Sequence, residues 1–300
     1  MYDDCSSVSL NELGVLRVTG ADGLAFLQGQ LSNDMQLLRA ARGLLAGYHN
    51  PQGRVIALLR LAQLASGDIV AVLPRELLTG VMQRLRKFIL RSKVHLADDS
   101  AQWQLNGIIG LPRGAATALP NGADGAAVID GTLVLRLPGT QRWLLLTPAG
   151  AAPLLRDCRP AAREVWQRVA LAAGEPQVYA ATTEEFVAQM LNLDVLGGIA
   201  FDKGCYTGQE VIARAHFRGR VKRRLQRFVS AAPQLLRPGD TGVLEDGRPF
   251  KVVDAVRLED GRCEFLAVTP LPGAAAEAGA APAERALQAQ PLPLPYALPE

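Results

Sequence analysis

The sequence predicts an α+β fold with largely antiparallel sheets, followed by a small β-barrel domain at the C-terminus. Two observations lead to this class. In residues 1–227, strand-like and helix-like segments mix without the regular alternation of a doubly wound parallel sheet. Further along, Asp246-Gly247 and Asp260-Gly261 each separate two β-rich runs, which is typical of tight hairpin turns.

The length and composition allow two domains. Apolar residues make up 49% and charged residues 20% of the 300 positions, which is a globular composition with room for a large core. We place the first domain at residues 1–227 and the second at 228–300. Within the second, the alanine-rich residues 273–286 predict a flexible loop, and the proline-rich residues 291–299 predict an extended end.

Several classes of protein are disfavoured. A formal net charge of +3 does not by itself imply a nucleic-acid partner. The four cysteines, at positions 5, 158, 205 and 263, are too scattered for a self-contained zinc or cluster site, so no metal site is expected. The acidic start does not resemble a secretory signal, and no apolar window is long enough to span a membrane. We therefore expect a cytoplasmic protein with reduced thiols.

The first elements form a strand and an amphipathic helix. Residues 15–18 predict a strand, and Asp22 is placed to cap a helix whose apolar residues Leu24, Leu27 and Leu31 recur at helical spacing. This helix leads into a polar cluster, Gln-Gly-Gln-Leu-Ser-Asn-Asp, at residues 28–34. Ordinary capping and turn chemistry explains such a cluster as well as a functional role does.

The middle of the chain predicts a meander and further short elements. Residues 44–48, 54–64 and 69–73 flank turn-forming segments and predict three antiparallel strands. Pro74 opens a helix that buries Leu78, Val81, Leu85 and either Phe88 or Ile89. Thr182 and Glu185 predict a capping box before a helix at 186–190. The remaining predictions are strands at 94–96, 105–111, 128–129, 133–137 and 143–147, and helices at 149–157 and 161–172, the second of which buries Val165, Trp166 and Val169.

The segment Lys-Gly-Cys-Tyr-Thr-Gly-Gln-Glu at residues 203–210 carries the densest polar chemistry. In an extended segment Lys203 and Cys205 point to the same side, so the ammonium group would favour the Cys205 thiolate. The residues after Gly208 predict a short helix or another strand, and a helix N-terminus would favour a nearby anion. The alternative is a glycine turn around a buried, inert thiol.

Other chemistry has weaker support. Neither a dinucleotide-binding glycine motif nor a P-loop occurs. A cysteine-histidine hydrolase would have to recruit a histidine such as His216. The basic run Arg214, Arg218, Arg220, Lys222, Arg223, Arg224 and Arg227 predicts either a solvated face or a rim that binds a polyglutamate tail, a phosphate or RNA. With only Phe217 and Phe228 nearby, stacking on bases is not favoured.

The same residues carry a resemblance to a known family. Residues 196–214, continued by Phe217-Arg218-Gly219, resemble the signature of the YgfZ family of folate-binding proteins, which are relatives of the glycine-cleavage T-protein. Further matches, which extend the resemblance over nearly the whole chain, are residues 26–34, Gly53-Arg54, Gly174-Glu175-Pro176 and Leu294-Pro295-Tyr296. The departures are Ser32, where threonine is common, and Met190-Leu191.

The resemblance implies a T-protein-like body with a central cavity for tetrahydrofolate and a C-terminal β-barrel. It also implies a role in the assembly or repair of iron-sulfur enzymes, including enzymes that thiolate tRNA. Cys205 then corresponds to the signature cysteine and acts as a reactive thiol in transient contact with a cluster, with Lys203 lowering its pKa. We expect no stably bound cluster, because the segment has no partner cysteine. The expected folate-binding or loop-orienting residues are Asn33, Asp34, Gln209, Glu210, Arg214 and Arg218.

Two alternatives remain at this stage. One is a folate-dependent one-carbon transferase that moves an aminomethyl or methyl group, with Asp34 as the proton-transfer group. The other is a module that makes a weak contact with tRNA through the basic run after Arg214. In every case the expected partners include folate and iron-sulfur enzymes or assembly proteins, and exclude a membrane.

Overall fold

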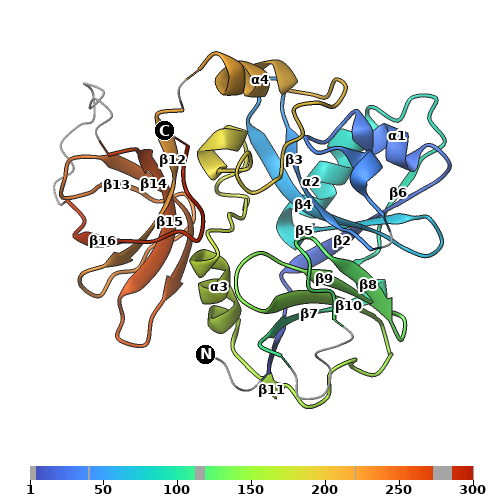
Figure 1. Ribbon diagram of the computed structural model, residues 1–300, viewed down its shortest axis with the longest axis horizontal. Coiled ribbons are helices and arrows are strands. Elements are labelled where there is room, and N and C mark those ends of the chain that lie inside the picture. Colours follow the sequence, from blue (N-terminus) through green and yellow to red (C-terminus); the bar gives the residue numbers. More distant parts are fainter. Residues whose placement is uncertain (1–4, 40, 112–118, 220, 273–285, 300) are drawn as a thin grey trace.

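A computed structural model describes residues 5–39, 41–111, 119–219, 221–272 and 286–299 of the chain. The predicted α+β class is confirmed. Three sheets are flanked by helices (Figure 1), and every ladder between named strands in these residues is antiparallel except the short one between β1 and β11. Within the described residues, no helix is long and apolar enough to cross a membrane.

The first sheet contains the predicted meander. Its strand order is β3-β4-β5-β2-β6. The turn between β3 and β4 is fixed by Asn50, whose side-chain oxygen accepts the Arg54 N–H at 2.9 Å, and by Gly53, whose φ is +70°. Helix α2 (Arg75–Arg86) follows Pro74 and buries Leu78, Val81 and Leu85, as predicted, and beyond its end Ile89 packs against the core while Phe88 is exposed. The strands are β2 (Leu13–Thr19), β3 (Leu44–His49), β4 (Val55–Gln63), β5 (Ile69–Pro74) and β6 (His95–Asp98).

The second sheet packs against the first. Its order is β11-β1-β7-β10-β9-β8, and its apolar side chains share one core with those of β2, β4 and β5. Helix α3 (Arg163–Ala172) leaves this sheet and lies between it and the C-terminal sheet (Figure 1). The strands are β1 (Ser6–Ser9), β7 (Trp103–Ile109), β8 (Ala126–Ile129), β9 (Thr132–Arg136), β10 (Arg142–Pro148) and β11 (Arg159–Pro160).

The C-terminal unit is a curled sheet. Both predicted Asp-Gly turns are present, with φ of +82° at Gly247 and Gly261. The order is β13-β14-β15-β12-β16, and in the described residues the two edges are joined by one isolated bridge, Leu244 with Leu287, so the predicted barrel is not closed. The predicted loop at 273–286 lies almost wholly outside the described residues. The strands are β12 (Arg223–Ser230), β13 (Thr241–Val243), β14 (Pro249–Arg257), β15 (Cys263–Pro270) and β16 (Ala289–Leu292).

Some local predictions were wrong. Residues 149–157 form no helix, because Gly150 adopts a φ of +80° and Pro153 has no N–H to donate. Asp22 does not cap helix α1 (Gly23–Gln28), since its carboxylate accepts the Lys93 N–H at 2.7 Å. Thr182 and Glu185 form no capping box, and only a short 3₁₀ turn, η3 (Ala188–Leu191), follows them.

The prediction of reduced thiols throughout was also wrong. Cys5 and Cys158 form a disulfide, with their Cα atoms 4.6 Å apart. Each cysteine comes directly before a strand, and β1 and β11 pair in parallel with Ser6 opposite Arg159, so the pairing brings the two thiols together. The two cysteines are 153 residues apart in the sequence, so no local pattern predicts that they pair.

A buried ion pair joins the C-terminal sheet to the rest of the chain. Arg224 at the start of β12 donates two hydrogen bonds to the Asp194 carboxylate, at 3.0 and 2.8 Å, and a third to the Gln189 carbonyl at 3.1 Å. The Arg224 and Asp194 side chains are only 4% and 9% exposed. Part of the predicted basic rim is therefore internal.

The substitution Asp194→Ala should lower the free energy of unfolding by roughly 3 kcal/mol, because it leaves the Arg224 guanidinium buried without its counter-ion. Urea unfolding measures the loss. The control is Glu185→Ala, which breaks a 2.6 Å pair with Lys251 where both side chains are far more exposed, and should cost less than about 1 kcal/mol. Equal losses in the two variants would contradict the structural role of Arg224.

Candidate functional site

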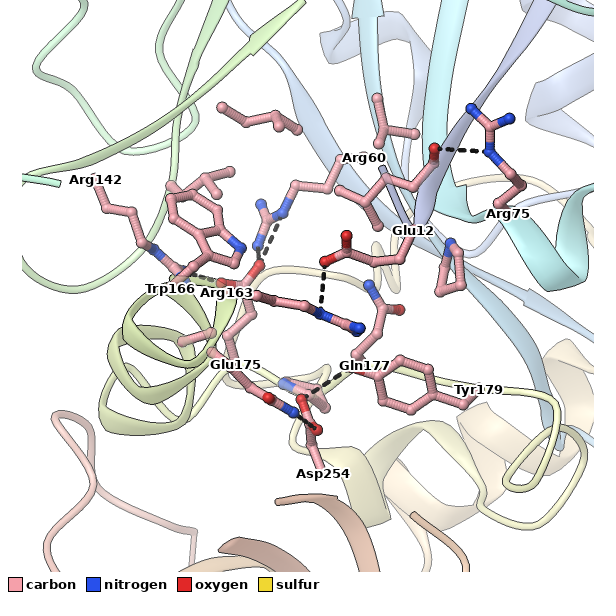
Figure 2. A pocket seen from close by; sticks show the side chains of 18 of the residues that line it. Glu12, Arg60, Arg75, Arg142, Arg163, Trp166, Glu175, Gln177, Tyr179 and Asp254 are labelled. Atoms are coloured by element: carbon pink, nitrogen blue, oxygen red, sulfur yellow. Dashed lines mark hydrogen bonds and ion pairs between the residues drawn. The ribbon is translucent and has the colours of Figure 1, made fainter. Parts of the chain in front are cut away.

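A cavity of about 570 Å³ lies where all three sheets meet helix α3. Its wall takes residues from the first sheet, the second sheet, α3, the segment after α3, and β14 of the C-terminal sheet (Figure 2). A volume of this size suits a small organic ligand. The cavity is therefore a candidate binding site assembled from every major part of the chain.

Glu175 is the central charge of the cavity wall. Its carboxylate is bound by Arg60 from β4, whose Nε donates at 3.0 Å, and by Arg142 at the start of β10, whose Nη2 donates to the other oxygen (Figure 2). Burial raises the pKa of Glu175, but Arg142 and Arg60 outweigh that effect and lower the pKa to about 2. Glu175 is thus ionised at any ordinary pH.

A second polar group lies at the side of the cavity nearest the C-terminal sheet. Asp254 of β14 accepts hydrogen bonds from Gln167 of α3 at 2.6 Å and from the Tyr179 hydroxyl at 3.1 Å. Burial raises the pKa of Asp254 to about 6, against the opposing effect of these donors. Asp254, Tyr179 and Gln167 therefore give one side of the cavity both donor and acceptor character.

The rest of the wall is aromatic and basic. Trp166 of α3 lies under the Arg142 guanidinium, 4.9 Å from its ring centroid, and packs so closely on Gly107 that a Cβ there would lie 2.4 Å from the ring. Arg163 pairs with Glu12 at 3.0 Å. Arg75 donates to the Leu13 carbonyl and has no carboxylate partner in the described residues. This wall fits a flat ring with a polar edge and an anionic substituent.

The signature segment forms a separate site around Lys203. The Lys203 ammonium is buried and donates to three carbonyls of the polar cluster, those of Gln28, Leu31 and Asn33, at 2.7, 2.6 and 2.8 Å. Burial lowers the pKa of Lys203 to about 8, against the opposing charge of Asp34. All three donors of the ammonium are therefore used to join residues 28–33 to residue 203.

Two side chains of the polar cluster add hydrogen bonds to the residues that precede Lys203. The Ser32 hydroxyl donates to the Gly198 carbonyl at 2.6 Å and accepts the Gly47 N–H at 2.8 Å. The Asn33 amide donates to the carbonyls of Leu45 and Gly197 at 2.7 and 2.8 Å. The polar cluster is thus a connector between the first sheet and the signature segment.

The other predicted site residues lie in the turn after the polar cluster, in the Cys205 loop and on helix α4. Asp34 accepts from the Gln28 amide at 3.0 Å and caps a 3₁₀ turn, η1 (Met35–Leu37). Gln209 accepts the Tyr206 N–H at 3.2 Å and begins helix α4 (Gln209–Phe217). Cys205 is exposed, which removes the alternative of a buried thiol. Glu210, Arg214 and Arg218 are exposed on α4 or at its end.

A buried histidine, His49, lies near Tyr206 of the signature segment. Burial lowers the pKa of His49 to about 3, so its ring is neutral, and neither ring nitrogen has a hydrogen-bond partner in the described residues. The ring lies 6.2 Å from that of Tyr206, which in turn contacts Lys203. His216 instead stacks on Phe201, with 3.7 Å between ring centroids.

The structure brings Lys203, Asn33 and Asp34 together, but it places all of the predicted residues away from the cavity. None of them is in the cavity wall formed by the described residues. Strand β4 links the two sites: its hairpin end contacts α4, where Gly53 lies against Val211, and Arg60 further along enters the cavity. The strand from Val55 to Arg60 spans roughly 17 Å. The one sequence signal for the cavity was Gly174-Glu175-Pro176.

The residues that sequence reasoning missed are dispersed along the chain. Arg60 and Arg142 lie in strands, and Asp254 lies beside a bulge in β14, so no motif contains them. Trp166 was predicted as a core residue of its helix, but it is half-buried because it faces the cavity. Among the described residues, no group of three histidine, cysteine, aspartate or glutamate side chains is placed to hold a metal ion.

Comparison with known proteins identifies the fold and the family. No family model matches the chain. The crystal structure of the glycine cleavage system aminomethyltransferase T from Bartonella henselae matches with a TM-score of 0.71, over 89% of this chain and 78% of that one. At 16% identity this likeness concerns the fold alone, and it identifies a protein with the T-protein fold.

The relatives found by sequence identify the family. The chain is 33% identical over 272 residues to the tRNA-modifying protein YgfZ of Escherichia coli O17:K52:H18, and equally to that of strain O7:K1. Each match covers 85% of this chain and 82% of the relative. The chain therefore belongs to the YgfZ family, and the resemblance found in its sequence is confirmed.

The substitution Lys203→Met should lower the free energy of unfolding by about 3 kcal/mol, because three buried carbonyls lose a charged donor. Urea unfolding measures this loss, and Lys87→Met at an exposed site should change the stability by less than about 0.5 kcal/mol.

Alkylation of Cys205 by iodoacetamide separates this anchoring role from activation of the thiol. The anchoring role predicts that Lys203→Met does not slow alkylation. A stable Lys203→Met variant with slow alkylation would show instead that the ammonium acts on the thiolate.

Proposed function

We propose that this protein binds tetrahydrofolate or a close derivative in the cavity and serves as an accessory factor in the maturation or repair of iron-sulfur proteins, including enzymes that modify tRNA. The observation that carries the proposal is the composition of the cavity wall. Aromatic, polar and basic groups lie on different parts of one wall, and these are the groups that the parts of a folate require. Membership of the YgfZ family supports the link to tRNA modification.

The residues of the wall suggest how a folate would be held. The flat pterin ring would lie against Trp166, with its amide and amino edge toward Asp254 and Tyr179. Asp254 is already bonded to Gln167 and Tyr179, so these side chains are held in place before a ligand arrives. The carboxylates of the glutamate tail would meet Arg75, which has no carboxylate partner in the described residues.

The signature segment supplies the second half of the proposed function. Cys205 is the exposed free thiol of the described residues, and Cys263 is buried. A single thiol can share a cluster with a partner protein but supplies only one of its ligands. We assign Lys203, Asn33 and Asp34 the role of holding the Cys205 loop on the first sheet, and Gln209 and Glu210 the role of shaping the start of α4.

The proposed location is the cytoplasm, where tRNA-modifying enzymes act. The Cys5–Cys158 disulfide would there meet reducing thiols. Both of its cysteines are buried, which limits their access to such thiols. No specific observation favours the alternative of a one-carbon transferase, since Asp34 caps a turn and is not part of the cavity wall.

The substitution Trp166→Leu should weaken binding of 5-formyltetrahydrofolate by roughly tenfold, because the variant loses the aromatic surface on which the pterin would stack. Isothermal titration calorimetry measures the affinity. Trp103→Leu is the matched control, because Trp103 is also partly buried but does not line this cavity, and it should bind as the wild type does. Absence of binding to the wild type would remove the folate proposal.

The substitution Cys205→Ala should abolish function in cells without changing the fold, because the side chain is exposed. The assay is the activity of an iron-sulfur tRNA-modifying enzyme in cells that lack the native protein and express the variant. Cys263→Ala, which removes the buried free thiol, should restore that activity. Full restoration by Cys205→Ala would remove the proposed role of this thiol.

A further inference from the structure

Helix α4 presents one face to solvent that the proposed folate function does not use. Ile212 is the one residue of α4 that is fully buried. Helical spacing places the side chains at positions 210, 211, 214, 217 and 218 on the side opposite Ile212. Figure 1 shows α4 at the outer edge of the molecule. Val211 lies against Gly53 of the β3–β4 hairpin. The α4 face, defined here as the exposed residues Glu210, Arg214, Phe217 and Arg218, is therefore open to a partner.

Aromatic rings gather at the C-terminal end of this face. The Phe217 side chain is 68% exposed, which is unusual for an aromatic residue on a well-packed helix. Its ring lies edge-on to His216 at 4.7 Å and to Phe201 at 6.0 Å, and His216 stacks flat on Phe201. These contacts hold the Phe217 ring in place while leaving most of it uncovered.

Exposed basic residues lie close to Phe217 in the sequence. Arg214 and Arg218 on the α4 face, and Lys222 just beyond it, are exposed, and their side chains have no hydrogen bond or ion pair with any other described residue. Other members of the basic run are used internally: Arg224 binds Asp194, and Arg227 binds Glu264 at 2.7 Å. Glu210 is the one carboxylate on the α4 face.

We propose that the α4 face binds an unpaired stretch of RNA, with a base stacked on Phe217 and neighbouring phosphates paired with Arg214, Arg218 and Lys222. A fixed, uncovered ring bordered by free cations is the arrangement by which proteins bind single-stranded nucleic acid. The sequence did not favour stacking because Phe201, distant in sequence, contacts Phe217 only in the folded chain, and Phe228 is buried in the C-terminal sheet.

An acidic protein segment is the competing partner for the same charges. It would use the arginines in the same way, but it would not need an exposed flat ring next to them. The observation that favours RNA is thus Phe217, whose ring is both uncovered and held by two aromatic neighbours. The inference goes beyond the proposed folate function and does not depend on it.

Fluorescence anisotropy with a labelled ten-nucleotide single-stranded RNA tests the proposal on the full chain. Phe217→Ala should weaken binding by about tenfold, through loss of base stacking. Arg214→Ala combined with Arg218→Ala should weaken binding and reduce the slope of log affinity against log salt by about 1.4, since each phosphate contact on a single strand contributes about 0.7.

Phe88→Ala is the matched control, because Phe88 is also exposed, at 47%, and lies beside the basic residues Lys87 and Arg91. It should bind RNA as the wild type does. The proposal is overturned if the wild type binds no RNA, if Phe217→Ala binds as tightly as the wild type, or if Phe88→Ala loses as much affinity as Phe217→Ala. Displacement of the RNA by polyglutamate at an equal concentration of charge would assign the α4 face to an acidic protein instead.

Discussion

The cavity depends on one buried carboxylate, Glu175, held between two guanidinium groups. Burying a lone carboxylate would cost several kcal/mol, and here Arg60 and Arg142 offset that cost from two different sheets. The same Arg142 lies over Trp166, so the ion cluster also positions the aromatic part of the wall. The ion cluster around Glu175 therefore adds a polar link between two sheets that also share an apolar core, and it shapes this part of the cavity wall.

The signature segment also contains a buried charge, which is stabilised mainly by backbone carbonyls. Lys203 is a buried cation bonded to three backbone carbonyls, with Asp34 as the nearby negative charge. This arrangement fixes the start of the Cys205 loop, while Cys205 itself remains exposed. Neither Lys203 nor Cys205 is in the described cavity wall, so the proposed ligand site and the proposed reactive thiol are separate. Strand β3 connects the two sites, because Asn33 donates to the Leu45 carbonyl and Leu45 pairs with Arg60 of the cavity wall.

The sequence predicted the parts of this structure that depend on local pattern. The meander, helix α2 and the two Asp-Gly hairpins follow from spacing and turn chemistry, and they are present. The signature segment was recognised because its residues are contiguous. The contact of Lys203 with residues 28–33 was not foreseen, although both segments were singled out, because spacing in sequence says nothing about which backbone carbonyls a lysine will reach.

The cavity was not predicted because its wall is formed by residues that are far apart in the sequence. Its wall combines single residues such as Arg60, Trp166 and Asp254, each of which looks like an ordinary strand or helix residue in its own segment. Only Glu175 lay in a segment that the sequence had singled out. The Cys5–Cys158 disulfide was not predicted for a similar reason, because it depends on the parallel pairing of two short strands that are distant in the sequence.

The central claim is that the ligand site is the cavity around Glu175 and Trp166, not the surface around Cys205. A crystal structure of the protein with 5-formyltetrahydrofolate tests it most directly. The account predicts the pterin ring against Trp166, with its polar edge at Asp254 and with no contact to the Cys205 sulfur. A folate bound at the Lys203–Cys205 segment, with the cavity unchanged, would contradict it.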